Sequence, residues 1–392
     1  MTANTLFLLN ESIMTASFWN SQTIRAIRRQ AAYRRLPVKN VSLEELIQGE
    51  VERNNVLAVV GGTITWHRNV LDLCFRQGIR PLFLTGTQDV FSSKASLIAP
   101  DQYLMCESVL RYCLSVDRRK VAFFANNPRS ITDRAKVNFL LESARYLNLP
   151  FSEKDVFHNS ADLKKCTEDF AEKAHLYDVV ICANDAAAAV MVTDPAFRDR
   201  VRIPEDLYLI TLGTSCLARL TKPSLTGVGL DYKQLGVVAV EEVLYLNQHP
   251  EVSAQTMLLR PTFYLGASTE YASFDFGPAS AYQPAAQAVA PEEYSHSFYA
   301  DAIVTEFQRI ETELNNADAL ERKILAAILR QEHMADTIEK CFISESTYKY
   351  RVRSICRVLG TENRSQIREL LSRWIDRDAF LRWAEGKQVT ED

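Results

Sequence analysis

Short runs of apolar residues alternate with longer amphipathic segments from residue 5 to about residue 268. Runs such as Val56–Val60 and Val179–Cys182 are apolar at every position, without the alternation of a half-exposed strand. Strands of this kind are typical of parallel sheets that helices cover on both faces. We predict further strands at Thr5–Leu9, Pro81–Leu84, Lys120–Phe124, Leu207–Thr211 and Leu225–Gly229.

The segments between these runs carry apolar residues at three- and four-residue steps, the spacing of an amphipathic helix. Strands that alternate with helices over this length predict an α/β fold with two Rossmann-like lobes. We expect one lobe at about residues 1–117 and 228–256 and the other at about residues 118–227 and 257–270. The predicted helices are Ser21–Arg34, Trp66–Gln77, Cys106–Ser115, Ser130–Leu147, Asp162–Ala174, Asp185–Val192 and Tyr232–Gln248.

The alternation ends near residue 271. Residues 271–295 are rich in Pro, Ala and Ser and have no periodicity, which predicts a linker. Everything beyond has helical spacing, so we expect a connecting helix at 296–316 and a small all-α domain at 317–392. The predicted helices in this part are Glu292–Asn315, Ala317–Arg330, Met334–Cys341, Glu345–Leu359 and Arg364–Trp383.

Length and composition agree with several soluble domains. A chain of 392 residues is too long for one ordinary core, and 47% hydrophobic with 24% charged residues is typical of globular proteins. The net charge of −4 gives no whole-chain reason to expect nucleic acid, so any DNA-binding surface must be local. The first residues lack the features of a secretory signal, and no apolar stretch is long enough to span a membrane. We therefore expect a cytoplasmic protein with no membrane partner.

Metal and enzyme motifs are missing from the sequence. The eight cysteines are scattered without a Cys-x-x-Cys pair, which favours reduced thiols over a metal site or disulfides. There is no P-loop, no Gly-x-Ser-x-Gly elbow and no His-Glu-x-x-His motif, and the six histidines are isolated. We expect neither a cofactor nor an enzymatic activity.

Several stretches resemble, in the right order, the sensor domains of lac-repressor-type (LacI/GalR) regulators, which have the type I periplasmic-binding-protein fold. The resemblance covers about residues 5–269. It rests on Val-Val-Ile-Cys-Ala-Asn184-Asp185, Arg202-Ile-Pro-Glu-Asp-Leu, Pro223-Ser-Leu-Thr followed by Asp231-Tyr-Lys-Gln-Leu-Gly, and Arg260-Pro-Thr-Phe-Tyr-Leu-Gly-Ala-Ser. It implies that the chain crosses between the lobes three times and that a small-molecule effector binds between them, at the carboxyl ends of the strands.

The resemblance also implies a set of ligand contacts. The aromatic side chains would stack on a ring-shaped effector, or simply cover the first helix. Arg134 lies near the family's arginine that grips hydroxyls or carboxylates. Asp185 would accept hydrogen bonds from ligand hydroxyls, or cap the helix that follows it. The candidate ligand-binding residues are Asn10, Phe18, Trp19, Trp66, Arg134, Asn184 and Asp185.

One departure from the family affects the choice of effector. Where the family usually carries an acidic pair after a strand, this chain has Leu212-Gly-Thr-Ser215. Two alternatives follow. The effector is a sugar, a sugar derivative or another small molecule, or the two lobes bind nothing and serve as a dimerisation scaffold that acts through a protein partner.

Residues 343–364 resemble the recognition segment of the LuxR-type (GerE) helix-turn-helix. The matches keep their spacing without a gap, at Ser344, Thr347, Lys349, Val352, Ile355, Leu359, Gly360, Asn363 and Arg364. The departures are Tyr348, Arg351 and Val358, where valine, histidine and lysine are usual. The resemblance implies that Lys349, Tyr350 and Arg353 reach base edges. Ser344, Thr347, Arg351 and Arg364 would contact phosphate or hold the helix in place.

Physical features of the same segment agree with this interpretation. Ser344 with Glu345 is suited to begin a helix, and Val352, Ile355 and Leu359 form a buried stripe. Residues 345–377 hold eight basic and four acidic side chains, a local charge of +4 that could neutralise phosphates. The alternative is a merely solvated face of a helical bundle. The sequence as a whole predicts a transcription regulator that binds operator DNA as a homodimer, because paired half-sites favour two-fold symmetry.

Overall fold

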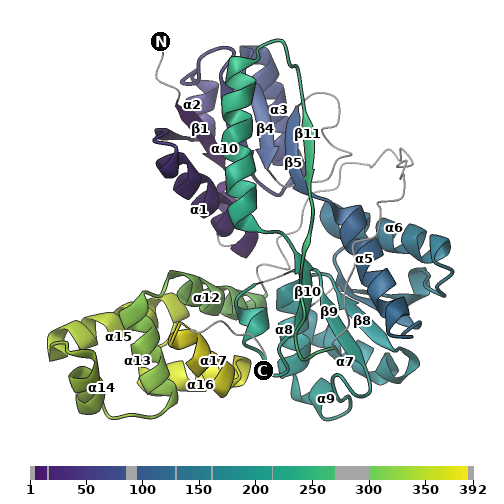
Figure 1. The fold of residues 1–392 in the computed structure, drawn as a ribbon, viewed down its shortest axis with the longest axis vertical. Coiled ribbons are helices and arrows are strands. Elements are labelled where there is room, and N and C mark those ends of the chain that lie inside the picture. Colours follow the sequence, from purple (N-terminus) through teal and green to yellow (C-terminus); the bar gives the residue numbers. More distant parts are fainter. Residues whose placement is uncertain are drawn as a thin grey trace.

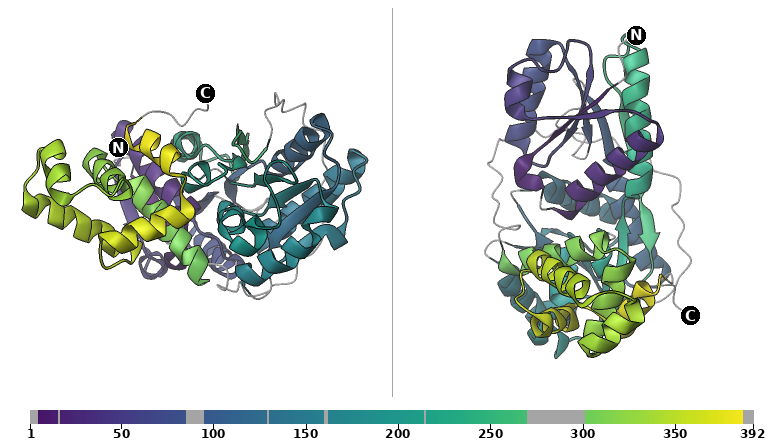
Figure 2. Two further views of the ribbon diagram at one scale, coloured as in Figure 1. Left: turned by 90° about the horizontal axis from the view of Figure 1, so that it is seen from below. Right: turned by 90° about the vertical axis from the view of Figure 1, so that its left-hand side faces the viewer.

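The computed structural model describes residues 5–15, 17–84, 95–128, 130–159, 162–213, 215–269 and 301–386. The described chain forms two α/β lobes and a helical C-terminal domain (residues 301–386) that lies at the side of the second lobe (Figures 1 and 2). The predicted linker at 271–295 and the start of the predicted helix at 292–315 lie outside the described residues.

Lobe 1 is built on a parallel six-stranded sheet with the order β11-β5-β4-β3-β1-β2. Val56, Ala58 and Val60 face α1 and α10, whereas Leu57 and Val59 face α3, because successive side chains of a strand point to opposite faces. Both faces are therefore covered. The elements are β1 (Leu6–Asn10), η1 (Ser12–Met14), α1 (Phe18–Tyr33), β2 (Val38–Val41), α2 (Leu43–Ile47), β3 (Val56–Val60), α3 (Ile64–Gln77), β4 (Arg80–Leu84), β5 (Ser96–Pro100), α10 (Tyr232–Gln248) and β11 (Thr256–Leu259).

Lobe 2 repeats this plan with the order β12-β10-β9-β8-β6-β7, in which only β12 runs antiparallel to its neighbour. Helices α5 and α6 cover one face, and α7, α8 and α9 cover the other. The elements are α5 (Gln102–Ser115), β6 (Val121–Asn126), α6 (Ile131–Tyr146), η2 (Glu153–Asp155), β7 (Val156–His158), α7 (Leu163–Lys173), η3 (Ala174–Leu176), β8 (Val179–Cys182), α8 (Asp185–Thr193), α9 (Pro195–Arg198), β9 (Tyr208–Thr211), η4 (Leu217–Arg219), β10 (Thr226–Gly229) and β12 (Thr262–Tyr264).

The chain crosses between the lobes after β5, after β10 and after β11, as expected. The first crossing differs in position from the prediction of residue 117. Cys106 and Val109 of α5 pack in one core with Val121 and Phe123 of β6, so α5 belongs to lobe 2 and the crossing comes near residue 101. Strand β11 likewise extends lobe 1 beyond the predicted end at residue 256.

The carboxyl ends of the two sheets face each other. Strands β5 and β11 lead directly out of lobe 1, and their sheet is parallel, so all of its carboxyl ends lie toward lobe 2. Strand β10 leads out of lobe 2 in the same way, parallel to β9. The loops after β1, β3, β6, β8 and β9, called here the interlobe loops, therefore lie at the position where open α/β sheets bind ligands.

The C-terminal domain consists of six helices within its described residues. The predicted helix at 364–383 is split, because Ile375 is extended and the Asp376 side chain caps a new helix by accepting from the Ala379 amide. Gly360 ends α15 in the left-handed conformation, with φ of 69°. The helices are α12 (Ala302–Asn316), α13 (Ala319–Leu329), α14 (Met334–Cys341), α15 (Glu345–Leu359), α16 (Arg364–Trp374) and α17 (Arg377–Ala384).

Candidate functional site

On the lobe 1 side, the buried carboxylate of Glu11 fixes two interlobe loops to each other. Its Oε2 accepts from the amides of Gly62 (2.7 Å) and Thr63 (3.1 Å), and its Oε1 accepts from the Thr63 hydroxyl. These amides precede α3, where donors have no partner within the helix and a negative charge is favoured. Glu11 was not among the predicted site residues, because no motif marks a carboxylate whose partners are about fifty residues away.

The predicted aromatic residues of lobe 1 are half-buried at the same loops. The ring of Trp66 lies directly over Gly61, and a Cβ on Gly62 would be 3.3 Å from Cζ2 of Trp19. The Phe18 ring meets the Tyr232 ring edge-on, with 5.7 Å between centroids. Trp19 and Trp66 pack against the apolar cores of lobe 1, and Phe18 lies against α10. Stacking of these rings on an effector stays a prediction.

Asn10 lies at the carboxyl end of β1. Its Oδ1 accepts a hydrogen bond of 2.7 Å from the Asn20 side chain of α1. The half-buried Asn10 amide is thus held toward the interlobe loops, where a polar ligand could meet it.

On the lobe 2 side, Asp185 is buried at the end of β8. Its Oδ1 accepts from the Thr211 hydroxyl (3.0 Å) and its Oδ2 from the Ser215 amide (2.8 Å). Burial raises the pKa of this carboxyl, while the hydrogen bonds and the charge of Arg219 act in the opposite direction. The suggestion that Asp185 caps α8 is wrong. Asn184 is the cap, since its side chain accepts from the Ala187 amide.

Gly213 provides the space that Asp185 occupies, since a Cβ at this position would lie 2.5 Å from Cγ of Asp185. We expect Gly213→Ala to lower the free energy of unfolding by about 1–3 kcal/mol, the cost of overpacking a closed site. Urea titration of the full chain measures this loss. Gly62→Ala is the matched control, because the atom that its Cβ would meet is the flexible end of Met14. Equal losses in both variants would contradict the packing of Asp185 against Gly213.

Helix α6 adds polar groups to the same edge of lobe 2. Lys136 Nζ donates to the Ala183 carbonyl (2.7 Å) and pairs with Asp133 (3.2 Å), whose other oxygen accepts from the Asn127 amide (3.3 Å). The predicted ligand residue Arg134 is half-buried one position along this helix. Asp133 and Lys136 were not among the predicted site residues, because their partners Asn127 and Ala183 come from two separate loops.

In the C-terminal domain, α15 presents one polar face. Tyr348, Ile355 and Leu359 are buried, and Val352 is half-buried, so the predicted apolar stripe is confirmed. The Ser344 hydroxyl caps the helix by accepting from the Thr347 amide. The opposite face is exposed and consists of Ser346, Lys349, Tyr350, Arg353 and Arg357.

Two of the predicted DNA-contacting arginines hold the domain together. Arg351 pairs with Asp318 (2.8 Å) and Glu321 (2.9 Å) at the start of α13. Arg364 donates to the Glu332 carbonyl (2.7 Å) and lies over the Tyr348 ring. Two roles were predicted for Arg351 and Arg364, contact with phosphate or holding the helix in place. These contacts fit the second role.

The basic residues of the exposed face have fewer partners. Lys349 pairs with Glu345 one turn earlier on the same helix. Within the described part of the chain, the guanidinium groups of Arg353 and Arg357 form neither a hydrogen bond nor an ion pair. Both guanidinium groups are therefore available to an external anion.

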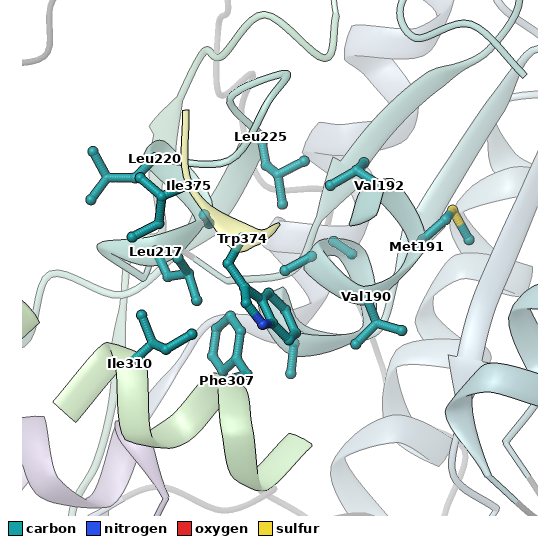
Figure 3. Close-up of a cluster of buried hydrophobic side chains, with 14 of the residues drawn as sticks. Val190, Met191, Val192, Leu217, Leu220, Leu225, Phe307, Ile310, Trp374 and Ile375 are labelled. Carbon is teal, nitrogen blue, oxygen red and sulfur yellow. The ribbon is translucent and has the colours of Figure 1, made fainter. Parts of the chain in front are cut away.

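The C-terminal domain shares an apolar core with lobe 2 (Figure 3). Trp374 is 1% exposed and lies 6.0 Å from the Phe307 ring, centroid to centroid. Its indole N–H donates to Glu306. Leu217 and Leu220 of lobe 2 close the other side of this cluster. The domain is thus packed on lobe 2 and not merely tethered to it.

No group of three or more His, Cys, Asp or Glu side chains in the described ranges could hold a metal ion. No described helix has the length and apolar character needed to cross a bilayer. All eight cysteines are free, and six of them are buried.

Comparison with known proteins identifies the fold of the two lobes. A family model described as a periplasmic binding protein-like domain matches residues 110–269. No curated protein sequence matches the chain. The two-lobed α/β fold is therefore a periplasmic-binding-protein-like fold, followed by a helical C-terminal region.

Solved structures of this fold cover about the two lobes. The transcription regulator CcpA of Lactococcus lactis has 16% identity and a TM-score of 0.55, over 68% of this chain and 100% of its own. The lac repressor dimer bound to operator and the anti-inducer ONPF has 16% identity and a TM-score of 0.58, over 68% and 95%. The transcriptional regulator CelR in complex with cellobiose has 12% identity and a TM-score of 0.57, over 68% and 86%.

Proposed function

We propose that this chain is a transcription regulator that binds DNA through α15 and senses a small molecule between its two lobes. The exposed face of α15 carries the proposal. A second helix, α14, precedes it across a short turn, and Ser344 caps its start. A helix presented in this way fits the major groove, and Lys349, Arg353 and Arg357 supply the charges that phosphates and guanine edges attract.

DNA selection from a random pool, using the full-length chain, tests the binding half of the proposal. We expect enrichment of sequences with two similar half-sites, because we also propose that the protein acts as a homodimer. Sedimentation of the protein without DNA measures its oligomeric state. Recovery of unrelated sequences at a salt-independent level would contradict DNA recognition by this domain.

The interlobe loops support the sensing half of the proposal. Glu11, Asp185 and Asn10 place carboxylate and amide oxygens at the facing edges of the two sheets. Such oxygens accept hydrogen bonds from hydroxyl groups. Among proteins of this fold, CelR is seen with cellobiose and the lac repressor with ONPF. We therefore propose a sugar or a sugar derivative as the effector of a regulator that acts in the cytoplasm.

One observation favours the second candidate, a ligand-free scaffold that acts through a protein partner. Both oxygens of Asp185 already accept hydrogen bonds within lobe 2, from Thr211 and Ser215. An effector would have to share or displace one of these bonds. In a scaffold the two bonds would simply remain.

A thermal-shift screen of sugars, sugar phosphates and small aromatic compounds separates the two candidates. For a sensor, we expect at least one compound to raise the melting temperature, because a ligand that binds only the folded state stabilises it. Asp185→Ala and, independently, Arg134→Ala should remove that shift. Melting of each variant without compounds provides its own baseline. No shift with any compound, in a protein that still selects DNA, would favour the scaffold.

A further inference from the structure

Three consecutive backbone amides of lobe 2 lie between two buried carboxylates. The Ser215 amide donates to Asp185 (2.8 Å). The amides of Cys216 (2.8 Å) and Leu217 (2.6 Å) donate to the two oxygens of Glu311. Residues 215–217, called here the 215–217 segment, are thus held from the interlobe side by Asp185 and from the other side by Glu311.

Glu311 belongs to α12, the first helix of the C-terminal domain. It is 1% exposed, and its remaining hydrogen bond comes from the Asn315 side chain (2.6 Å). Burial raises the pKa of Glu311 to about 7, although these hydrogen bonds act against the shift. A buried carboxylate is costly unless donors compensate it, so the two amides of the 215–217 segment are required for α12 to sit here.

Helix α12 contacts both lobes. Its Phe307 and Ile310 pack in the core shared with lobe 2, where α12 contacts η4 and α8, and Figure 1 shows it near α8. Its end touches lobe 1, where Arg25 of α1 donates to the Asn315 carbonyl (2.8 Å). A displacement of the 215–217 segment or of one lobe against the other therefore acts directly on the helix that carries the C-terminal domain.

We propose that the 215–217 segment transmits occupancy of the interlobe site to the DNA-binding domain. An effector hydroxyl that donates to Asp185 competes with the Ser215 amide for the same carboxylate. The segment then shifts, and the two bonds that it donates to Glu311 weaken. Helix α12 and the domain behind it change position against lobe 2. The inference rests on the proposed function, because it states how the sensing site regulates the DNA-binding site.

Hydrogen exchange of backbone amides in the full-length protein tests the Glu311 side of this link. Glu311→Gln replaces one acceptor by a donor that faces an amide N–H. We expect exchange at Cys216 and Leu217 to rise about tenfold, because one of their two hydrogen bonds to the carboxylate is lost. Glu313→Gln is the matched control, because Glu313 is also buried on α12 yet makes no hydrogen bond to lobe 2 among the described residues.

The Asp185 side of this link is tested by a substitution at Asp185, which makes no hydrogen bond to α12 among the described residues. Asp185→Asn should raise exchange at Cys216 and Leu217 as well as at Ser215, and its effect should not add to that of Glu311→Gln. Thr211→Val removes the other hydrogen bond of Asp185 and should leave the 215–217 segment near its wild-type exchange. A purely structural Asp185 would alter exchange at Ser215 alone, and this outcome would overturn the proposal.

The two proposals fail in different measurements. Hydrogen exchange is recorded without DNA or effector, so unchanged exchange at Cys216 and Leu217 in Glu311→Gln overturns the link alone. Circular dichroism confirms that each variant is folded. Loss of the proposed function would show instead as DNA binding that is insensitive to changes on the exposed face of α15.

Discussion

The Arg353→Ala variant is expected to bind its selected DNA about ten- to a hundredfold more weakly than the wild type, because one arginine on a base edge contributes about 1–3 kcal/mol. Arg353 lies in the middle of the exposed face of α15, and its guanidinium group has no hydrogen-bond or ion-pair partner among the described residues. Its loss should also relax sequence preference at one position of the site. Gel shifts with the selected duplex and with single-base variants of it measure both effects.

Lys349→Ala should weaken DNA binding to a similar extent for all sequences. It should also lower the slope of log affinity against log salt concentration by about one, because one phosphate contact is lost. Arg382→Ala is the charge-matched control, since Arg382 is exposed on α17, outside α14 and α15. Its DNA affinity should stay near that of the wild type. Wild-type gel shifts for both Arg353→Ala and Lys349→Ala, in folded protein, would refute the assignment of α15 as the recognition helix.

Trp374→Ala is expected to lower the free energy of unfolding by about 3–5 kcal/mol, the usual cost of deleting a large buried aromatic side chain. Trp374 fills the centre of the core that the C-terminal domain shares with lobe 2 (Figure 3). The substitution also removes one of the two side-chain donors to Glu306, the other being Arg373. Because the cavity lies between two domains, we expect the unfolding curve to separate into two transitions.

Urea titration followed by tryptophan fluorescence and far-ultraviolet circular dichroism detects this separation. Trp383→Ala provides the comparison within the same domain. Trp383 is half-buried on α17, where it packs against Phe380 and lies beneath Arg322. Because less of this ring is buried, its removal should lower the free energy of unfolding by less than the removal of Trp374. A single transition at the wild-type denaturant concentration in Trp374→Ala would contradict the packing described here.

The central strands were predictable because both of their faces are buried. Val56–Val60 and Val179–Cys182 are apolar throughout and were predicted with the observed bounds. The strands that were missed lie at or next to the sheet edges, and they include β5, which is buried but was not predicted. Val-Lys-Asn-Val of β2 and the three residues of β7 are too polar or too short to give a signal. The edge strand β11 leaves alternate residues exposed and depends on its pairing with β5.

Long-range packing explains the remaining differences. The spacing of apolar residues predicted α5 with its observed end but with its start at Cys106 in place of Gln102. It gave no information on which sheet this helix covers, so the lobe boundary was misplaced. The roles of Glu11 and Glu311 could not be predicted for the same reason, because their partners are backbone amides far away in the chain. In contrast, the cap, stripe and exposed face of α15 arise within one helix, and the sequence predicted them apart from the burial of Tyr348 and Cys356.

The position of β11 has a consequence for the order in which the chain folds during synthesis. This strand pairs with β5 at the edge of lobe 1, yet it leaves the ribosome after every parallel strand of lobe 2. Lobe 1 is therefore incomplete until about residue 259 has emerged. Since domains fold as units while translation proceeds, the surface of η4 and α8 is in place before α12 appears. The helical C-terminal domain is thus made after both lobes, against a surface that is already built.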